Sequence, residues 1–419
     1  MQAKSRYNCI VSKYLQKYLY LPYILIALVS QFFSLLRHYP TNNPCAQVFS
    51  VAKYTSLLIN CDSAVFMKDA QNPARLFNGD SVYQDRPLPT LLVSVLSKAW
   101  HYFAFPDYQR SVVGNSGVSF TYSLLTYVLF LFLNVLILSI ACWLGLKLVL
   151  VFFKNYNIDF VFYPKFAIFI VSIISLNEIT KTFFWTPHSQ MFNLLLPVYF
   201  FFLLQFRNAN IESKFFVINC FFILVLLFCY AFYILLIIPM LIMNWKNIKT
   251  RILMILLCVT PYLLYPTLLE LFGGQYYSLG LEKYRLFVWL LDSIKNAPEA
   301  PSIYGNFYSF IKTFPIFPVF LIIVLLLWWI LQKNSFSVEL FKLVKFEFYA
   351  VLIYFLFLAV YGYYARRLTY TLIIFLTLII LKVFLYNFNR LKDTRYFLLL
   401  KVVGGIIFFS WIFTNGPLV

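Results

Sequence analysis

The sequence predicts an all-α membrane protein, a polytopic bundle of about eleven transmembrane helices that forms one integral membrane domain over residues 1–419. Hydrophobic residues make up 62% of the chain and charged residues 12%, whereas soluble domains average roughly 45–50% and 25%. Long apolar runs such as 317–331 lack the alternation of barrel strands. Because lipid cannot satisfy backbone polar groups, we expect these runs to be helices.

Basic residues set the orientation. Lys4, Arg6, Lys13 and Lys17 precede the first apolar run, which places the N-terminal segment 1–19 in the cytoplasm. A first span over 20–36 then makes 37–118 the first outer loop.

Inside this loop we expect interfacial helices over 45–60 and 63–76, the second capped by Asp62 or Ser63. Segment 88–105 is apolar but short and contains Lys98 and His101. An interfacial helix, a re-entrant helix and a true span all remain open for it.

The later topology follows from the same rules. The apolar run 215–245 is too long for one upright helix and ends before basic residues, so we expect two short spans with a tight turn near Tyr230. The third outer loop covers 272–314, with a surface helix over 282–296. A basic inner loop covers 332–347, and the last spans cover 348–363, 368–386 and 397–413.

The net charge of +19 raises the question of nucleic acid, but lysines and arginines in short loops of a membrane protein explain it better. We expect membrane lipids and no nucleic acid as partners. The chain has seven cysteines without a CxxC pair, so no metal site is predicted. Cys45 and Cys61 share the first outer loop and could form a disulfide in an oxidising compartment.

The acidic residues gather in the polar segment 60–87. It carries Asp62, Asp69, Asp80 and Asp85, four of the chain's 15 acidic residues. Asp62 adjoins an apolar bundle at the membrane boundary, so we expect it to act as a base, with helix capping as the alternative. Asp80 and Asp85 are typical turn residues. The sequence contains no DxD motif, so we do not predict a bound divalent cation.

Further candidates lie on the same predicted outer side. Arg366 and Arg367 form a short turn between apolar spans, where guanidinium groups match phosphate, although snorkelling to lipid headgroups explains them too. Glu178, His188 and Gln190 belong to the second outer loop, where His188 could orient a substrate hydroxyl or phosphate, with a capped start for the span at Met191 as the alternative. Arg86, before the apolar segment 88–105, completes the predicted substrate-binding set.

Two stretches carry a family resemblance. The run Asp62-Ser63-Ala64 with Phe66 and Ala70, then Arg86-Pro87-Leu88, resembles the first outer loop of membrane-embedded glycosyltransferases of the GT-C superfamily. The turn at Ala365-Arg366-Arg367 is similar to an Arg-containing turn near the donor phosphate in that family. Ser63 stands where many relatives carry Glu.

The resemblance implies an activity. It implies inverting transfer of a sugar from a polyprenyl-phosphate donor to an unspecified acceptor on the extracytoplasmic face, with Asp62 as the base. The lipid-linked sugar is then the substrate and no cofactor is required. The expected location is the bacterial inner membrane, as a multi-pass protein. A transporter or flippase of a lipid-linked glycan and a surface-polysaccharide polymerase remain alternatives.

Overall fold

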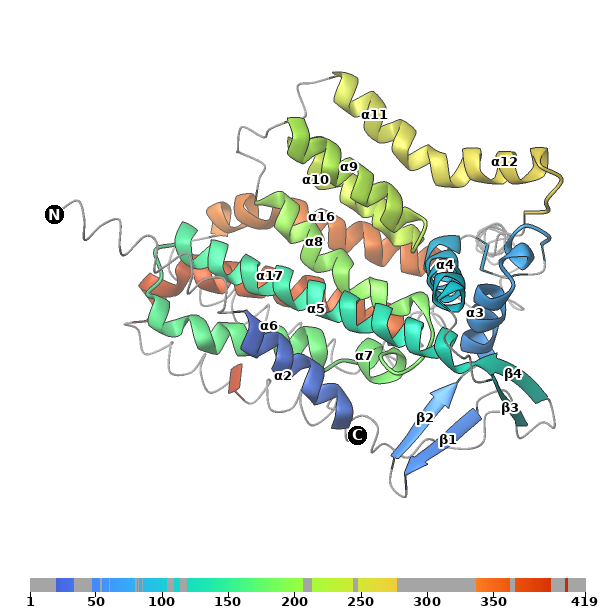
Figure 1. Cartoon of the computed structure of the whole chain (residues 1–419). Helices are drawn as coiled ribbons and strands as arrows, with labels where there is room; N and C mark the ends of the chain where they lie inside the picture. The colour runs from blue at the N-terminus through green and yellow to red at the C-terminus, as the bar shows by residue number, and fades with distance from the viewer. Residues whose placement is uncertain are drawn as a thin grey trace, which may run out of the picture.

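The computed structural model describes residues 20–33, 47–52, 55–59, 61–79, 81, 83–84, 86–103, 109–113, 119–205, 213–243, 248–276, 337–361, 366–392 and 404–405. This part of the chain is mostly helical, as predicted, and long helices run side by side across Figure 1. The central bundle consists of α2 (Leu21–Phe32), α5 (Leu124–Asn155), α6 (Tyr163–Ser175), α8 (Leu195–Leu204), α16 (Ser337–Tyr361) and α17 (Arg366–Leu391).

A second group of helices packs beside this bundle. The predicted turn near Tyr230 is present, because α9 ends at Leu227 and a new helical segment begins at Ala231. The described elements of this group are α9 (Ser213–Leu227), η5 (Ala231–Leu236), α10 (Ile237–Met243), α11 (Ile248–Val259), the π-helical η6 (Thr260–Leu264) and α12 (Tyr265–Leu271).

Small elements cover one end of the bundle, which we call the site end (Figure 1). They are β1 (Gln47–Ala52), β2 (Thr55–Ile59), α3 (Cys61–Gln71), η2 (Pro73–Leu76), α4 (Pro87–Tyr102), β3 (Gln109–Val113), β4 (Ser119–Ser123), α7 (Glu178–Phe183) and η4 (Ser189–Leu194). At the opposite end, η3 (Phe160–Phe162) leads into α6, and Tyr156 meets Tyr386 with ring centroids 5.4 Å apart.

The first outer loop corrects one expectation. An interfacial helix was expected over 45–60, but β1 and β2 form an antiparallel hairpin there, with Val48 opposite Leu58. Strands β3 and β4 form a second hairpin. The two valines and the phenylalanine of Gln47–Ala52 suit an extended strand better than a helix. The helix expected over 63–76 is present as α3 followed by η2.

Close helix packing depends on a small residue in α5. A Cβ atom added to Gly145 would lie 2.7 Å from Ile174 Cδ1 and 3.3 Å from Ile170 Cγ1, both on α6. Glycine at this crossing therefore lets the backbones of α5 and α6 approach, as small residues do between membrane helices.

Two described helices are long and apolar enough to cross a membrane, Leu124–Asn155 and Tyr370–Leu391. Five shorter apolar helices accompany them: Leu21–Phe32, Phe160–Ser175, Ser189–Leu204, Phe215–Leu227 and Ala231–Ile242. The number of spans, predicted as eleven, is therefore not confirmed. The predicted span 317–331 and the predicted surface helix 282–296 lie outside the described residues. Of the predicted span 397–413, only residues 404 and 405 are described.

The basic inner loop expected over 332–347 is wrong from Ser337 onward, because α16 begins there. Glu347 lies within this helix and is fully buried. Its Oε1 atom accepts a hydrogen bond from Lys382 Nζ on α17, which also donates to Leu343 O at 2.8 Å. A charge pair thus lies inside the bundle, although Glu347 was expected in a loop.

Candidate functional site

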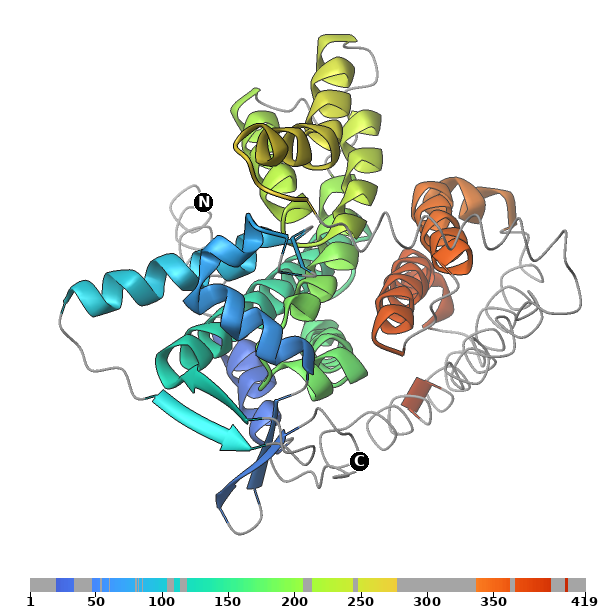
Figure 2. The same cartoon turned by 90° about the vertical axis from the view of Figure 1, so that its right-hand side faces the viewer.

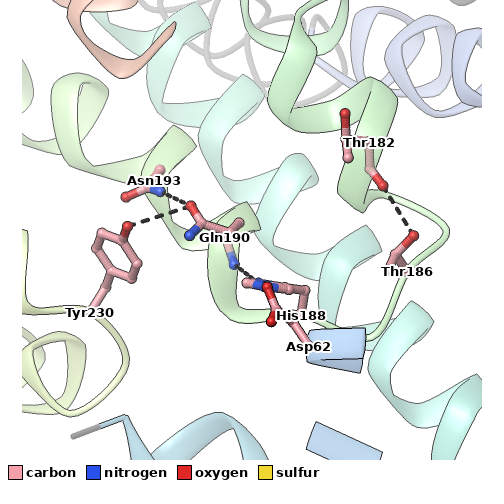
Figure 3. Close-up of polar contacts among 7 residues, drawn as sticks. All are labelled: Asp62, Thr182, Thr186, His188, Gln190, Asn193 and Tyr230. Atoms are coloured by element: carbon pink, nitrogen blue, oxygen red, sulfur yellow. Dashed lines mark hydrogen bonds and ion pairs between the residues drawn. The ribbon is translucent and has the colours of Figure 1, made fainter. Parts of the chain in front are cut away.

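Side chains from four distant stretches of the chain meet at the site end of the bundle, and Figure 3 shows residues from three of these stretches. They come from α3, from the N-terminus of α4, from η4 with the loop that precedes it, and from the turn before η5. The sequence candidates Asp62, Arg86, His188 and Gln190 are all part of this group.

Asp62 and His188 are in direct contact across 126 positions of sequence. His188 Nε2 lies 3.3 Å from Asp62 Oδ2. The Asp62 side chain is 36% exposed, whereas that of His188 is 2% exposed. The carboxylate can therefore meet a substrate, and the imidazole lies behind it. Asp62 belongs to the first turn of α3, which begins at Cys61, so it does not occupy the predicted cap position.

The hydrogen bonds of His188 define its tautomer. Its Nδ1 atom accepts the backbone N–H of Gln190 at 3.1 Å, because His188 is the N-cap of η4. The proton of the neutral ring must then be on Nε2, which faces Asp62. A neutral imidazole therefore donates to the carboxylate and holds its orientation.

Aromatic rings enclose His188. The centroids of Phe183 and Phe66 lie 4.6 Å and 5.0 Å from that of the imidazole, and Tyr83 lies 6.4 Å away. Phe66 and Tyr83 stack on each other at 4.4 Å. Ring packing on several sides restricts the rotation of the imidazole and keeps water from it.

The loop that carries His188 is fixed to α5. Asn134 Nδ2 lies 3.0 Å from Phe183 O, 3.0 Å from Phe184 O and 3.1 Å from Thr186 O. Tyr127, also on α5, donates its hydroxyl to Trp185 O at 2.6 Å. These bonds satisfy carbonyl groups that the end of α7 leaves free, so the longest helix of the bundle determines where His188 lies.

Gln190 connects this loop to the turn before η5. Its Oε1 atom accepts from Asn193 Nδ2 at 2.6 Å and from Tyr230 Oη at 3.4 Å. Gln190 and Asn193 can meet because side chains three residues apart eclipse in a 3₁₀ helix. Asn193 Oδ1 and Ser189 Oγ are buried without a hydrogen-bond partner in the described structure.

Arg86 supplies positive charge beside these groups. Its guanidinium carbon lies 5.5 Å from the centroid of Tyr83 and 5.0 Å from that of Tyr230, and the side chain is half-buried. Contact with two aromatic faces stabilises a cation and orients it. Gln84 anchors the preceding backbone by donating to Leu76 O at 2.6 Å and to Gln275 O at 2.9 Å.

Glu178 is not brought to Asp62 or His188 by any described contact. It lies in the first turn of α7, and its Oε1 atom accepts from Thr182 Oγ1 at 3.4 Å. In Figure 3, Thr182 lies away from the cluster around Gln190. Glu178 thus stands as a helix-terminal residue, since a carboxylate is favourable at a helix N-terminus.

Arg366 and Arg367 open α17 rather than forming a turn ahead of it. Helix α17 packs against α7 and η4, while its far end meets Tyr156. The first turn of α17 is therefore at the site end, and the side chains of both arginines lie outside the described residues.

Of the other acidic residues of segment 60–87, the structure describes Asp69. Asp69 is fully buried and accepts from Arg75 Nε at 2.8 Å and from Ser81 Oγ, so it ties α3 to the loop that follows. Asp80 and Asp85 lie outside the described residues, as does Cys45. The turn roles and the disulfide therefore stay predictions.

Sequence reasoning missed Tyr83, Tyr230, Asn193 and Asn134. Asn134 had a usable signal, because it is a lone amide within the apolar run of α5. Tyr230 was noted only as the position of a turn. Tyr83 and Asn193 had no signal beyond polarity, since their partners are far away in sequence.

The part of the chain that the structure describes contains no group of three or more His, Cys, Asp or Glu residues arranged to hold a metal ion. The described groups can accept a proton at Asp62 and attract an anion at Arg86. No family model matches the chain, and neither does a curated protein or a solved structure.

Proposed function

We propose that the protein is a multi-pass membrane glycosyltransferase that moves a sugar from a polyprenyl-phosphate donor to an acceptor hydroxyl on the extracytoplasmic face. The contact between Asp62 and His188 carries this proposal. It gives a partly exposed carboxylate a fixed orientation at one end of an apolar bundle, with a guanidinium group nearby. A proton acceptor next to a phosphate-binding cation is what the displacement of a lipid phosphate requires.

The reaction balances with these groups alone. Asp62 takes the proton of the acceptor hydroxyl, whose oxygen attacks the anomeric carbon of the donor sugar. The bond from that carbon to the phosphate oxygen breaks, and polyprenyl phosphate leaves with the electron pair. A single displacement inverts the anomeric configuration. Arg86 offsets the negative charge that develops on the leaving phosphate, and Arg366 and Arg367 are further candidates for this role.

We assign His188 a different role from the substrate contact that was expected for it. The imidazole is too deeply buried to meet a substrate and donates to Asp62 instead. We assign it as the positioning residue for the catalytic base. Gln190 fixes the imidazole through its backbone N–H, and its side chain supports Tyr230, on which Arg86 rests.

A second candidate, a transporter of a lipid-linked glycan, is favoured by one observation. Transport proteins carry buried charges along their pathways, and Glu347 and Lys382 form such a pair between α16 and α17. The pair holds itself together through hydrogen bonds, including one to Leu343 O. We rank transport second because the described charges close to Asp62 are at the edge of the bundle.

The experiment that tests the proposed function uses purified protein in lipid nanodiscs. Synthetic polyprenyl-phosphate hexoses and pentoses are offered together with membrane glycolipids or glycans as acceptors, and release of free polyprenyl phosphate is measured by mass spectrometry. Release with formation of an inverted glycoside supports the proposal. Movement of an intact lipid-linked glycan across proteoliposomes, with no bond broken, would establish the transporter instead.

A further inference from the structure

Helix α4 has its polarity reversed relative to a helix of a soluble protein. Its buried face combines Val93, 1% exposed, with polar side chains, because Thr90, Ser94 and Ser97 are exposed by only 1%, 3% and 9%. Its outward side is mostly apolar, with Leu92 exposed by 43% and Val95 by 63%, and Lys98 and His101 are exposed toward its C-terminal end. A surface helix in water has the opposite arrangement, with its apolar stripe facing the core.

The outward residues form one continuous stripe. Leu92, Val95, Leu96 and Ala99 follow the i, i+3, i+4, i+7 spacing of one helix face, and all four are exposed. Trp100 is 44% exposed near the end of the same helix. Such a stripe must have an apolar partner, because apolar surface of this kind is costly in water.

The position of α4 indicates which partner this is. Figure 1 shows α4 nearly end-on at the site end, while α5 and α17 run across the picture. In the rotated view of Figure 2, α4 extends sideways from the bundle. It therefore runs across the direction of the two helices that are long enough to span a membrane, as an interfacial helix does.

We propose that the outward face of α4 docks on the hydrocarbon surface of the lipid bilayer, with the helix lying in the plane of the membrane interface. The exposed face of α5, which includes Val128 and Phe132, is apolar in the same way. Acyl chains around a spanning α5 would thus meet α4 as well. Trp100 is a residue type that favours the level of the lipid headgroups.

A bilayer fits this face better than a second copy of the chain. Apolar side chains are exposed on α5 and on α9 as well as on α4, among them Phe221 and Phe222 of α9. A surface that surrounds several helices matches a solvent rather than a partner with a boundary. A dimer would instead cover one limited patch.

Docking of α4 has a consequence for the site, which rests on the proposed function. Arg86 is the N-cap of α4, so an interfacial α4 holds this guanidinium at headgroup depth. The phosphate of a lipid-linked donor could then reach Arg86 without leaving the membrane, and its hydrocarbon tail could stay among the acyl chains.

The test is photo-crosslinking in nanodiscs made of phosphatidylethanolamine and phosphatidylglycerol. The photoreactive residue p-benzoylphenylalanine replaces Val95 or Leu96 on the outward face, and Lys68, exposed on neighbouring α3, serves as the matched control. After illumination, mass spectrometry separates lipid adducts from adducts between protein copies. This readout does not depend on sugar transfer, so it can fail or succeed independently of the proposed activity.

The expected result is a several-fold higher yield of lipid adducts at positions 95 and 96 than at position 68. Adducts between two copies of the chain at positions 95 and 96 would overturn the proposal in favour of a dimer. Yields at positions 95 and 96 no higher than the yield at position 68 would overturn it as well, because the outward face of α4 would then contact lipid no more than the control does.

Discussion

Two of the contacts that the structure describes between a carboxylate and a nitrogen-bearing side chain differ completely in their surroundings. Asp62 meets His188 at the site end, where the residues come from helix ends and loops, and its side chain is 36% exposed. Glu347 meets Lys382 in the middle of two long helices, where the side chains are 0% and 5% exposed. One contact can exchange with a ligand, and the other is enclosed.

The difference shows how burial decides what a charge pair does. A buried pair stabilises a fold only while both partners remain, because removal of either one leaves an uncompensated charge. A pair at the edge of the bundle can exchange a proton with a substrate without disturbing the packing of the core. We therefore expect variants of the first pair to lose activity and variants of the second to lose stability.

The largest expected effect is that of Asp62→Asn on activity. The amide has nearly the same shape and can still accept from His188 Nε2, but it cannot take a proton. We expect kcat to fall by about 10²–10⁴-fold, the usual contribution of a general base, with an unchanged unfolding temperature. Polyprenyl phosphate release in nanodiscs gives the rate, and intrinsic fluorescence gives the unfolding temperature.

A matched control is Asp159→Asn at the opposite end of the bundle. Asp159 is exposed and accepts from Val161 N at 3.0 Å as the cap of η3, a role that Asn fills equally well. This variant should keep full activity. If Asp62→Asn also turned over at the wild-type rate, Asp62 would have no part in proton transfer.

The enclosed pair should show the opposite behaviour. Either Glu347→Leu or Lys382→Met alone should lower the free energy of unfolding by about 3–5 kcal/mol, because the remaining charge is buried without its partner. The double variant should recover most of this loss. Denaturation of the three variants and the wild type in one detergent gives the coupling energy of the pair.

The same double variant separates the two candidate functions. If the pair only stabilises α16 against α17, a well-folded double variant transfers sugar normally. A folded double variant that has lost all substrate movement would instead place Glu347 and Lys382 on a transport pathway.

The two regions also differ in how far the sequence could predict them. Asp62, Arg86, His188 and Gln190 were identified because polar residues are scarce in an apolar chain, so each one is conspicuous. The contact between Asp62 and His188 joins residues 126 positions apart, and no local pattern predicts such a pairing. The tautomer of His188 and its enclosure by Phe66 and Phe183 required coordinates.

Glu347 was misplaced for a physical reason. Several charged residues precede it, including Lys342 and Lys345. Such a dense group of charges is typical of a loop in water between membrane spans. A lysine on the neighbouring helix compensates Glu347, and that partner is invisible to a local window. Residues 45–60 were predicted as an interfacial helix because they precede membrane spans. The extended propensity of the segment pointed to strands, and the structure has the hairpin β1–β2 there.

Asn134 links the two regions and predicts a middle-sized effect. Asn134→Leu removes the donor shared by Phe183 O, Phe184 O and Thr186 O, which costs about 1–3 kcal/mol for buried groups left unsatisfied. Activity should fall at temperatures where the protein is still folded, because the loop that holds His188 is released from α5. The control Ser139→Ala removes a hydroxyl that bonds only within α5, at Val135 O, and should change neither quantity.

If Asn134→Leu lowered stability but left kcat and KM unchanged, the position of the loop would not matter for catalysis. The contact between Asp62 and His188 would then tolerate movement of the loop that carries His188. Its contrast with the enclosed pair of Glu347 and Lys382 would weaken. A fall in kcat with a constant KM would sharpen it, since that result indicates a misplaced base rather than a lost substrate contact.

The smallest effect is expected for Tyr230→Phe, which tests the outer edge of the site. The lost hydroxyl makes a long hydrogen bond of 3.4 Å to Gln190 Oε1, whereas the ring that supports Arg86 remains. We expect KM for the donor to rise about two- to fivefold, equivalent to roughly 0.5–1 kcal/mol. Tyr230→Leu removes the aromatic face as well and should raise KM further, because the cation loses its contact with the ring. Equal KM values for the two variants would show that the ring does not hold Arg86 in place for the donor phosphate.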